Sequence, residues 1–215
     1  MQKVTIYELY DILERATKGF PEPLAEHVFH WTKSPFFTLV STVLSARTKD
    51  SLTITKLPDL WSTAKTPLEF SQLTTERLEP MLRPIGFYKT KARHLIDLGV
   101  IVHQQYHDVV PSNMEDLLKL PGVGRKTANL QLSVVNNIPA ICVDTHVHRI
   151  MNHIGYVKTS TPEQTEFALR KKLPMDLWNK TNYLLVLTGQ NLANHIQIKD
   201  PNNILNTYEL IERVR

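Results

Sequence analysis

The stretch of sequence that decides the fold is Leu120-Pro-Gly-Val-Gly-Arg-Lys126, which lies between two segments with helical apolar spacing. Its two glycines let the backbone turn tightly and approach a partner without interference from a Cβ atom. The second helix is expected to begin near Gly124, so that unpaired N–H groups and the positive end of the helix dipole face outward. Such a turn suits a phosphate, and Arg125 adds positive charge. An ordinary helical hairpin, whose glycines only relieve crowding, fits the same residues equally well.

Lys126 is expected in the first turn of that second helix, where the dipole favours the neutral amine that a nucleophilic lysine needs. Eighteen residues later, the stretch Val143-Asp-Thr-His-Val-His-Arg149 places Asp144 as the cap of a helix that ends near Gly155. A carboxylate there can face a developing positive charge. Taken separately, Lys126 would be interpreted as a solvent-exposed lysine and Asp144 as an ordinary helix cap. Together with the hairpin, they indicate a catalytic pair.

In the rest of the chain, the glycines and prolines are placed as they are in a helical protein. Among 215 residues there are only 7 glycines, and the 13 prolines fall mostly between periodic segments or at their first position. Alternating strand patterns are nearly absent, so the chain is predicted to be all-α, with about ten helices. Helix starts are predicted at Ser34-Pro35, Thr66-Pro67 and Thr161-Pro162, capping boxes at Ser112 with Glu115 and Thr161 with Gln164, and helical stretches at Val4–Leu13, Lys89–His107 and Trp178–Leu187.

The composition excludes several classes of protein. Hydrophobic residues make up 42% of the chain, which is enough for a core, and no apolar run approaches the roughly 20 residues of a membrane span. The single cysteine, Cys142, excludes an internal disulfide and a cysteine-cluster metal site, and it is expected to be a small buried side chain. The net charge of +4 permits nucleic-acid binding without demanding it. We expect an intracellular protein with no targeting signal.

Four segments, in this order, resemble the helix-hairpin-helix, Gly-Pro-Asp motif DNA glycosylases, and most closely the endonuclease III family. They are Leu44–Asp50, Ile85–Ala92, LPGVGRKTA at residues 120–128 and VDTHVHRI at residues 143–150. The resemblance covers most of the chain, and the four segments together are far more specific than any one of them.

The resemblance implies two helical domains that flank a DNA-binding cleft. One is a six-helix barrel over residues 31–138, which contains the helix-hairpin-helix at about 112–136. The other joins residues 1–30 to residues 139–215.

The activity that the resemblance implies is base-excision repair by a bifunctional DNA glycosylase/AP lyase. Lys126 would attack C1′ of a flipped nucleotide, and Asp144 would assist its deprotonation and stabilise positive charge on the sugar. The Schiff base would permit strand cleavage by β-elimination. The backbone N–H groups of Gly122, Val123 and Gly124 would hold a phosphate of double-stranded DNA, and the protein would act as a monomer.

Position by position, Arg47 and Phe87 match the two residues that fill the hole left by a flipped base. Arg47 departs from the usual glutamine, and a phosphate contact is equally open for it. Phe87 replaces a leucine, and the alternative for it is a core aromatic. His146 matches a family position near the DNA, whereas His148 is expected to be structural. A phosphate-following edge is expected from the basic residues Lys49, Lys89, Lys91 and Arg93.

No metal site formed by side chains is expected. His103 with His107 and His146 with His148 have suggestive spacing, but neither pair has an obvious third ligand. The resemblance implies a monovalent cation held by hairpin carbonyls, which are those of Leu118, Leu120 and Val123.

Endonuclease III typically carries a C-terminal iron–sulphur cluster on four cysteines, and these are missing here. The family spacing, counted from Ala193, reaches Asp200, Asn203 and Glu209. We therefore expect no cluster and no other cofactor. The loop must be held by other means, for which the candidates are Pro201, a cap at Asn202 or Asn203, and an apolar face of Ile204, Leu205, Tyr208 and Leu210.

Two other functions remain open. A monofunctional glycosylase for mismatched adenine, thymine or uracil would share the fold but usually lacks a lysine at position 126. A non-catalytic DNA-binding protein would use the hairpin only as a phosphate clamp. The preferred base is also open between an oxidised pyrimidine, uracil and a bare abasic site, and we expect an oxidised pyrimidine.

Overall fold

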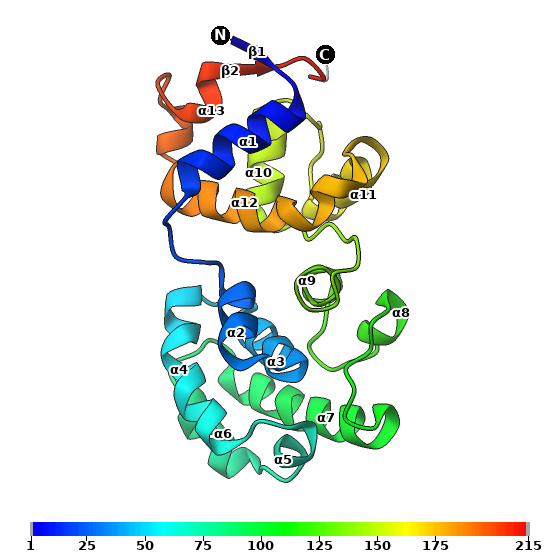
Figure 1. Ribbon diagram of the computed structural model, residues 1–215. Coiled ribbons are helices and arrows are strands. Elements are labelled where there is room, and N and C mark those ends of the chain that lie inside the picture. Colours follow the sequence, from blue (N-terminus) through cyan, green and yellow to red (C-terminus); the bar gives the residue numbers. More distant parts are fainter. Residues whose placement is uncertain (1, 214–215) are drawn as a thin grey trace. The chain divides into compact units, whose positions relative to one another are not determined.

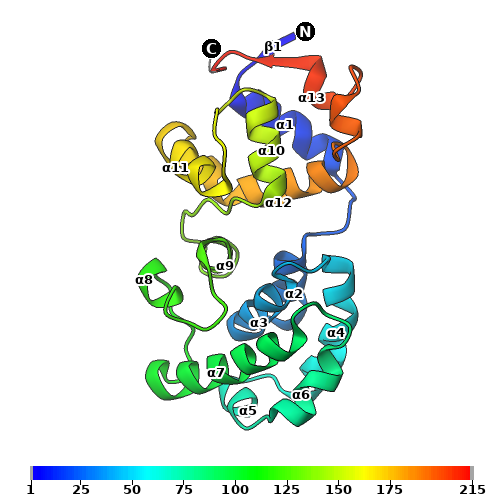
Figure 2. The same cartoon turned by 180° about the vertical axis from the view of Figure 1, so that it is seen from behind.

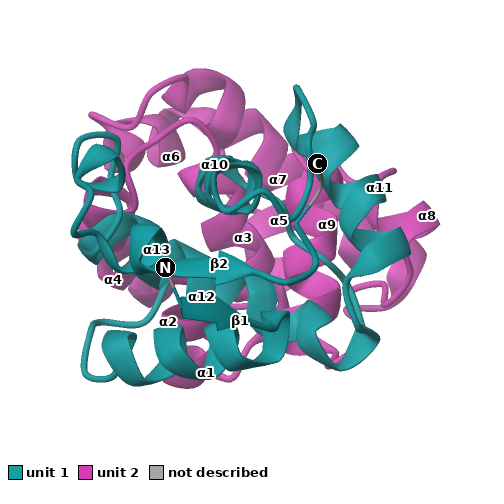
Figure 3. Cartoon of the chain, turned by 90° about the horizontal axis from the view of Figure 1, so that it is seen from above, with its two compact units in different colours: residues 1–23, 139–215 teal, residues 24–138 magenta. Residues whose placement is uncertain are grey.

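The computed structural model describes residues 2–213, and its contacts divide the chain into two compact units (Figure 3). Unit 1 comprises Met1–Pro23 with Pro139–Arg215, and unit 2 comprises Leu24–Ile138. The later boundary coincides with the expected one, but the earlier boundary lies at residues 23/24 instead of 30/31. The reason is helix α2 (Leu24–Thr32), which packs along α3 (Pro35–Ser45) within unit 2.

Unit 2 consists of helices joined by short loops (Figures 1 and 2). After α2 and α3 it contains α4 (Asp50–Thr63), α5 (Pro67–Ser71), α6 (Thr75–Leu82), α7 (Tyr88–Tyr106), α8 (Met114–Leu117), α9 (Arg125–Leu130) and the π-helical stretch η1 (Gln131–Val135). The long helix α7 crosses α5 closely at Gly99. A Cβ atom on Gly99 would lie 2.7 Å from the backbone nitrogen of Ser71 and 2.8 Å from the carbonyl oxygen of Pro67. Glycine is therefore what allows these two helices to touch.

Several helix starts in unit 2 follow the predicted caps. Ser34 accepts the backbone N–H of Phe37, and Thr66 forms a capping box with Glu69. The capping box predicted for Ser112 and Glu115 is wrong by one residue. Asn113 is the cap of α8, and its side chain accepts the N–H of Asp116 at 2.9 Å. An asparagine caps as well as a serine, so residue type alone could not choose between these neighbours.

Unit 1 contains a short parallel strand pair that the sequence did not reveal. Strand β1 (Gln2–Val4) pairs with β2 (Tyr208–Leu210), with Val4 opposite Leu210. The expectation that Val4 begins the first helix is therefore wrong, because α1 (Ile6–Thr17) starts after a capping box at Thr5. Strands of three residues are too short to show an alternating pattern, and their pairing is set by contacts between the two ends of the chain.

The other elements of unit 1 are helical. They are α10 (Thr145–His153), α11 (Pro162–Lys172), η2 (Met175–Leu177), α12 (Trp178–Asn191), η3 (Gln197–Lys199) and α13 (Ile204–Thr207). Helices α1 and α10 both pack against α12, and the apolar core of unit 1 lies among them (Figures 1 and 2). Thr161 caps α11 as predicted, but Gln164 accepts the N–H of Ser160 rather than that of Thr161. Across residues 2–213, the structure has no helix with the length and apolar character that crossing a membrane requires.

Candidate functional site

The two glycines of the hairpin between α8 and α9 differ in backbone conformation and in the space around them. Gly122 has a φ of +75°, and a Cβ atom there would lie 2.9 Å from Cγ1 of Val43 and 3.0 Å from Nδ1 of His94. Gly124 is the N-cap of α9 with a φ of −103°, and a Cβ atom there would meet nothing within 4 Å. The fold of unit 2 therefore requires glycine at position 122, whereas it does not explain the glycine at position 124.

One expected phosphate ligand of the hairpin is corrected by the structure. The N–H of Val123 donates to the carbonyl of Leu120 at 3.1 Å, so the turn itself uses this group. The Val123 side chain is buried at 8% exposure. Val123 therefore shapes the turn, and the phosphate role stays a prediction for Gly122 and Gly124.

Lys126 is the second residue of α9, as predicted, and its side chain is exposed. Helix α9 is anchored by packing, because the four residues that follow Lys126 are buried: Thr127, Ala128, Asn129 and Leu130. Gln131, at the start of the π-helical continuation, donates from its side chain to the carbonyl of Pro35 at 3.1 Å. Lys126 is therefore an exposed lysine on an anchored helix, and the chemistry it can supply is that of its amine.

Asp144 is the N-cap of α10, which confirms the cap predicted from the sequence. Its Oδ1 atom accepts the N–H groups of His146 at 2.8 Å and Val147 at 2.9 Å. Both hydrogen bonds are accepted by Oδ1, so Oδ2 takes no part in the cap. The helix ends before Gly155, whose φ of +71° is the left-handed conformation expected after a helix.

The two histidines that follow Asp144 have different surroundings. The His146 ring is half-buried against Gly189 of α12, where a Cβ atom would lie 2.3 Å from Nδ1 of the ring. His148 Nδ1 lies 2.7 Å from Oγ1 of Thr165, a structural contact of the kind expected. Cys142 is fully buried, as predicted. The DNA contact of His146 stays a prediction.

Arg47 and Phe87 are brought together by unit 2. The guanidinium carbon of Arg47 lies 4.9 Å from the centroid of the Phe87 ring. Phe87 is 60% exposed, so the alternative of a core aromatic is wrong. Both residues have a left-handed backbone, with φ of 56° for Arg47 and 59° for Phe87. Their entry into DNA stays a prediction, but they form one exposed pair.

Lys91 does not belong to an exposed phosphate-following edge. Its side chain is only 6% exposed, and its Nζ donates to the carbonyls of Leu44 and Ala46 and to Oγ1 of Thr48 at 2.7 to 2.8 Å. The expected DNA contact is therefore wrong for Lys91, since all three ammonium hydrogens are used inside the protein. The other basic residues of that edge are exposed, namely Lys49, Lys89 and Arg93.

The C-terminal residues at the cluster positions do not fit an iron–sulphur cluster. Ala193 is fully buried, and Glu209 lies in strand β2. Asn203 caps α13 by accepting the N–H of Leu205 at 3.0 Å, and its amide donates to the carbonyl of Leu192 at 2.7 Å. Side chains of these types cannot replace thiolates, and the chain holds a single cysteine.

Arg149 binds the loop that begins at Ala193, a contact that the sequence did not predict. Its Nη2 donates to the carbonyl of Ala193 at 2.6 Å, and so links α10 to the start of the loop. Burial lowers the pKa of Arg149, and the nearby charge of Asp144 opposes that shift. The residue stands within the quoted stretch 143–149, but only the tertiary structure shows what it holds.

Neither histidine pair has the surroundings of a metal site. Nδ1 of His103 lies 3.0 Å from Oδ1 of Asp108. Within residues 2–213, the structure brings together no group of three or more histidine, cysteine, aspartate or glutamate side chains that could hold a metal ion.

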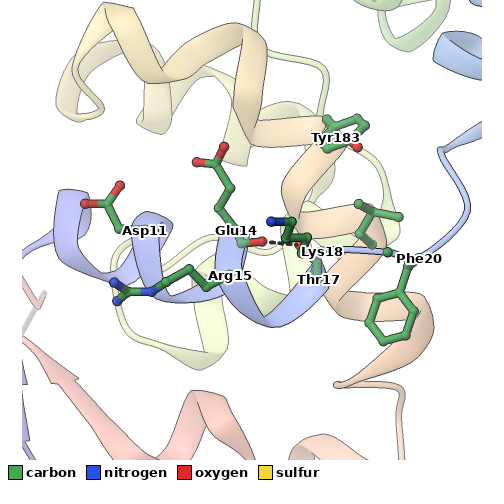
Figure 4. A pocket seen from close by; sticks show the side chains of 9 residues that line it. Asp11, Glu14, Arg15, Thr17, Lys18, Phe20 and Tyr183 are labelled. Atoms are coloured by element: carbon green, nitrogen blue, oxygen red, sulfur yellow. Dashed lines mark hydrogen bonds between the residues drawn. The ribbon is translucent and has the colours of Figure 1, made fainter.

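A hollow of about 600 Å³ lies at the end of α1 in unit 1 (Figure 4). It is bounded by residues of mixed character, which are Asp11, Glu14, Arg15, Thr17, Lys18, Gly19, Phe20, Tyr183 and Leu187. Asp11, Glu14 and Arg15 extend into its lining from α1, and none of the predicted site residues lines it. The predicted site therefore does not coincide with this hollow.

Comparison with known proteins supplies the family. Residues 40–175 match the family described as HhH-GPD superfamily base excision DNA repair protein. Endonuclease III of Thermotoga maritima is 45% identical over 164 residues, which are 76% of this chain and 77% of that protein. Endonuclease III homolog 2, chloroplastic, of Arabidopsis thaliana is 38% identical over 74% of this chain, and the match spans only 43% of that longer protein.

A solved structure of a trapped endonuclease III–DNA covalent intermediate has the same fold. Its TM-score is 0.80 at 30% sequence identity, and the match covers 93% of this chain and 92% of that one. The agreement of sequence, hairpin, capped aspartate and fold leads to one conclusion. The chain belongs to the HhH-GPD superfamily, as a base-excision repair DNA glycosylase of the endonuclease III type.

Proposed function

We propose that the protein is a bifunctional DNA glycosylase/AP lyase that removes a damaged base, an oxidised pyrimidine, from double-stranded DNA and then cuts the strand. The observation that carries the proposal is Lys126, exposed in the first turn of α9 directly after the glycine hairpin. Monofunctional members of the family usually lack this lysine. The similarity to a trapped endonuclease III–DNA covalent intermediate supports the same chemistry, because trapping requires a nucleophile on the protein.

Base removal and strand cleavage both follow from one bond to Lys126. The Nζ lone pair forms a bond to C1′ of the flipped nucleotide, and the base leaves with the electrons of its glycosidic bond and takes up a proton. The nitrogen lone pair then expels O4′ of the sugar, which is protonated, and an iminium remains. The iminium acidifies the C2′ proton, and removal of that proton expels the 3′ phosphate by β-elimination.

Asp144 assists the first of these steps. Its Oδ1 is committed to the cap of α10, which fixes the carboxylate, while Oδ2 is the atom that takes a proton from the attacking amine. The negative charge of Asp144 also stabilises the positive charge that develops on the sugar. Lys126 belongs to unit 2 and Asp144 to unit 1.

The remaining predicted residues bind and shape the DNA. The N–H groups of Gly122 and Gly124 hold a phosphate with help from the charge of Arg125, and this contact reads no sequence. Arg47 and Phe87 fill the hole left by the flipped nucleotide. Since phosphate contacts release counterions, binding weakens steeply as salt is raised.

The hairpin carbonyls fit a hard cation. Carbonyl oxygens are the ligand type that such ions prefer, and the carbonyl of Leu120 keeps a second lone pair beside the one used by Val123. A monovalent cation there, with Leu118, Leu120 and Val123 as ligands, would stabilise the turn that presents the N–H groups.

The protein works without an iron–sulphur cluster, in this proposal. The purified protein is therefore colourless and free of iron, and its activity survives chelators and oxidants that destroy clusters. Stoichiometric iron with visible absorption would contradict this.

The test of the proposed function is borohydride treatment of the protein with a duplex that carries an abasic site. The wild-type protein is expected to form a covalent adduct, because borohydride reduces the iminium to a stable amine. Lys126→Gln should bind the duplex but form no adduct and leave the strand intact. Lys119→Gln is the matched control, since it removes another lysine of the same hairpin that pairs with Glu115 and Asp116.

The outcomes separate the three candidate functions. Adduct formation that needs Lys126 supports the bifunctional enzyme. Base release without any adduct would identify a monofunctional glycosylase, and binding without base release would identify a non-catalytic clamp. A panel of duplexes with defined lesions then ranks oxidised pyrimidines against uracil and mismatched bases.

A further inference from the structure

Lys91 is a buried lysine whose ammonium is fully used. The side chain is 6% exposed, and Nζ donates to the carbonyl of Leu44 at 2.7 Å, the carbonyl of Ala46 at 2.8 Å and Oγ1 of Thr48 at 2.8 Å. An ammonium has three N–H donors, so each donor has an acceptor. Burial lowers the pKa of Lys91, which is the cost of removing the charge from water.

The three acceptors lie at the end of α3 and in the loop that follows. Leu44 is in the last turn of α3, where carbonyls lack helical partners, and Ala46 is the C-cap of that helix. The positive charge of Lys91 also suits a helix C-terminus. One side chain thus holds the loop at residues 45–49, which carries Arg47.

The helix that carries Lys91 begins directly after Phe87, the second member of the exposed pair. The N–H of Lys91 donates to the carbonyl of Phe87 at 3.0 Å, in the first turn of α7, for which Phe87 is the N-cap. Lys91 is therefore bonded to the segments on both sides of the contact between Arg47 and Phe87. The contact between the Arg47 guanidinium and the Phe87 ring joins the same two segments.

Both members of the pair have a strained backbone. A left-handed conformation at a residue with a side chain costs roughly 1–2 kcal/mol, and it persists only where the surroundings enforce it. The φ angles of Arg47 and Phe87 are 56° and 59°, and Phe87 remains 60% exposed. Burial of these two side chains does not account for their conformation. Arg47 lies in a turn that the N–H of Thr48 closes on the carbonyl of Ser45 at 2.9 Å. The Lys91 ammonium binds the residues on either side of Arg47, through the carbonyl of Ala46 and Oγ1 of Thr48.

We propose that Lys91 is a positioning residue that holds Arg47 and Phe87 as a preformed pair, ready to enter the DNA stack where a nucleotide is extruded. The proposal rests on the proposed function as a DNA glycosylase and assigns Lys91 a task within it. A preformed pair lowers the ordering cost at the moment of extrusion. Without the ammonium, three acceptors lose their partner, and the loop at residues 45–49 is released.

The experiment compares Lys91→Met with Lys56→Met. Both substitutions remove one lysine charge from unit 2, and Lys56 lies on α4, outside the proposed site. Extrusion is measured by 2-aminopurine fluorescence beside a tetrahydrofuran abasic analogue, and affinity is measured for the same duplex and for an undamaged one. Hydrogen exchange of the amides at residues 45–49 is measured without DNA.

Lys91→Met is expected to speed exchange at residues 45–49 and to weaken extrusion about tenfold, in line with the cost of unsatisfied buried acceptors. Affinity for undamaged DNA should fall much less than extrusion does, because the hairpin contacts lie outside this loop and only Lys49 and Arg47 within it are candidates for a phosphate contact. Lys91→Arg, which keeps the charge and donors, should recover part of the extrusion. Equal loss of affinity for both duplexes, or extrusion at the control level, would overturn the proposal.

A double-mutant cycle tests whether Lys91 acts through the pair. In the Phe87→Ala background, Lys91→Met should weaken extrusion much less than about tenfold, since the pair is already broken. Independent, multiplicative losses would overturn the proposal. If Lys91→Met does not fold, Thr48→Val removes one acceptor on the loop side, and it should loosen residues 45–49 in the same direction.

Failure of the proposed function is distinguishable from failure of this inference. A wild-type protein that forms no borohydride adduct, but whose extrusion signal depends on Lys91, contradicts the lyase chemistry and supports the positioning role. A wild-type protein that forms the adduct, with extrusion independent of Lys91, supports the chemistry and overturns the positioning role.

Discussion

The regions around Lys126 and Asp144 hold their functional residues by different means. In unit 2, Lys126 follows a turn whose shape depends on the backbone of Gly122, and its own side chain is exposed. In unit 1, the Asp144 side chain itself forms the cap of α10 through two hydrogen bonds. The aspartate therefore has a structural role as a helix cap beside its chemical one, and a substitution must keep the cap if it is to test the chemistry alone.

The largest predicted effect distinguishes Lys126 from Asp144 by the activity of their variants on two substrates, a damaged-base duplex and an abasic duplex. Lys126→Gln is expected to lose strand cleavage about a thousandfold or more on both damaged-base and abasic duplexes, because no amine remains. Asp144→Asn should lose base excision to a similar degree but keep some cleavage at a pre-formed abasic site, where no base must leave. Single-turnover rates on both duplexes check this.

The asparagine variant also isolates the chemical role of Asp144. Its amide oxygen can still cap α10, so its stability should match the wild type, whereas Asp144→Ala should lose about 1 kcal/mol of unfolding free energy. Equal loss of activity by Asp144→Asn on both duplexes would mean that Asp144 is mainly structural, and the contrast with Lys126 would disappear.

The next effect concerns the C-terminal segment that completes unit 1. Leu205 is 3% exposed in the core of that unit, so Leu205→Ala should lower the free energy of unfolding by about 2–5 kcal/mol. Ile196→Ala is the control, since Ile196 is 82% exposed in the same region and should change stability by less than about 0.5 kcal/mol. Urea unfolding measures both.

Truncation before Asn202 should destabilise unit 1 further, because it removes α13 and β2, the partner of β1. An unchanged melting temperature would show that the segment is dispensable and that the missing cluster needs no replacement.

A smaller effect should distinguish the two hairpin glycines. Gly122→Ala is expected to cost about 1–2 kcal/mol of stability, since φ is +75° and Val43 lies within 2.9 Å of the added atom. Gly124→Ala should change stability by less than about 1 kcal/mol but weaken binding to all duplexes, damaged or not, because its Cβ atom would stand before the N–H groups. Unfolding and filter binding separate the two, and a loss confined to lesion DNA would make the hairpin a specificity element.

The smallest effect is expected for Phe87→Ala. At 60% exposure the side chain contributes little to stability, so unfolding should be unchanged, while lesion processing falls about tenfold through poorer extrusion. Ile54→Ala is the control for loss of an exposed apolar side chain in unit 2, since Ile54 is 39% exposed on α4. Weaker binding of Phe87→Ala to undamaged DNA would contradict a role confined to extrusion.

Local sequence rules were sufficient for the features that depend on neighbouring residues. The caps at Ser34, Thr66 and Asp144 satisfy backbone N–H groups two or three positions away, so residue type and spacing predict them. The glycine turn before α9 and the left-handed Gly155 after α10 follow from backbone preference alone. The family motifs consist of such local features, which is why the chain could be assigned from its sequence.

Tertiary structure alone decided the features that depend on distant residues. Lys91 looks like a surface lysine in the sequence, yet it is buried because the end of α3 and the loop after it offer three oxygens, 43 to 47 residues away along the chain. Strand β1 exists only because β2, at the other end of the chain, pairs with it. Contacts of this kind carry no local spacing signal, because the partners meet only after the chain has folded.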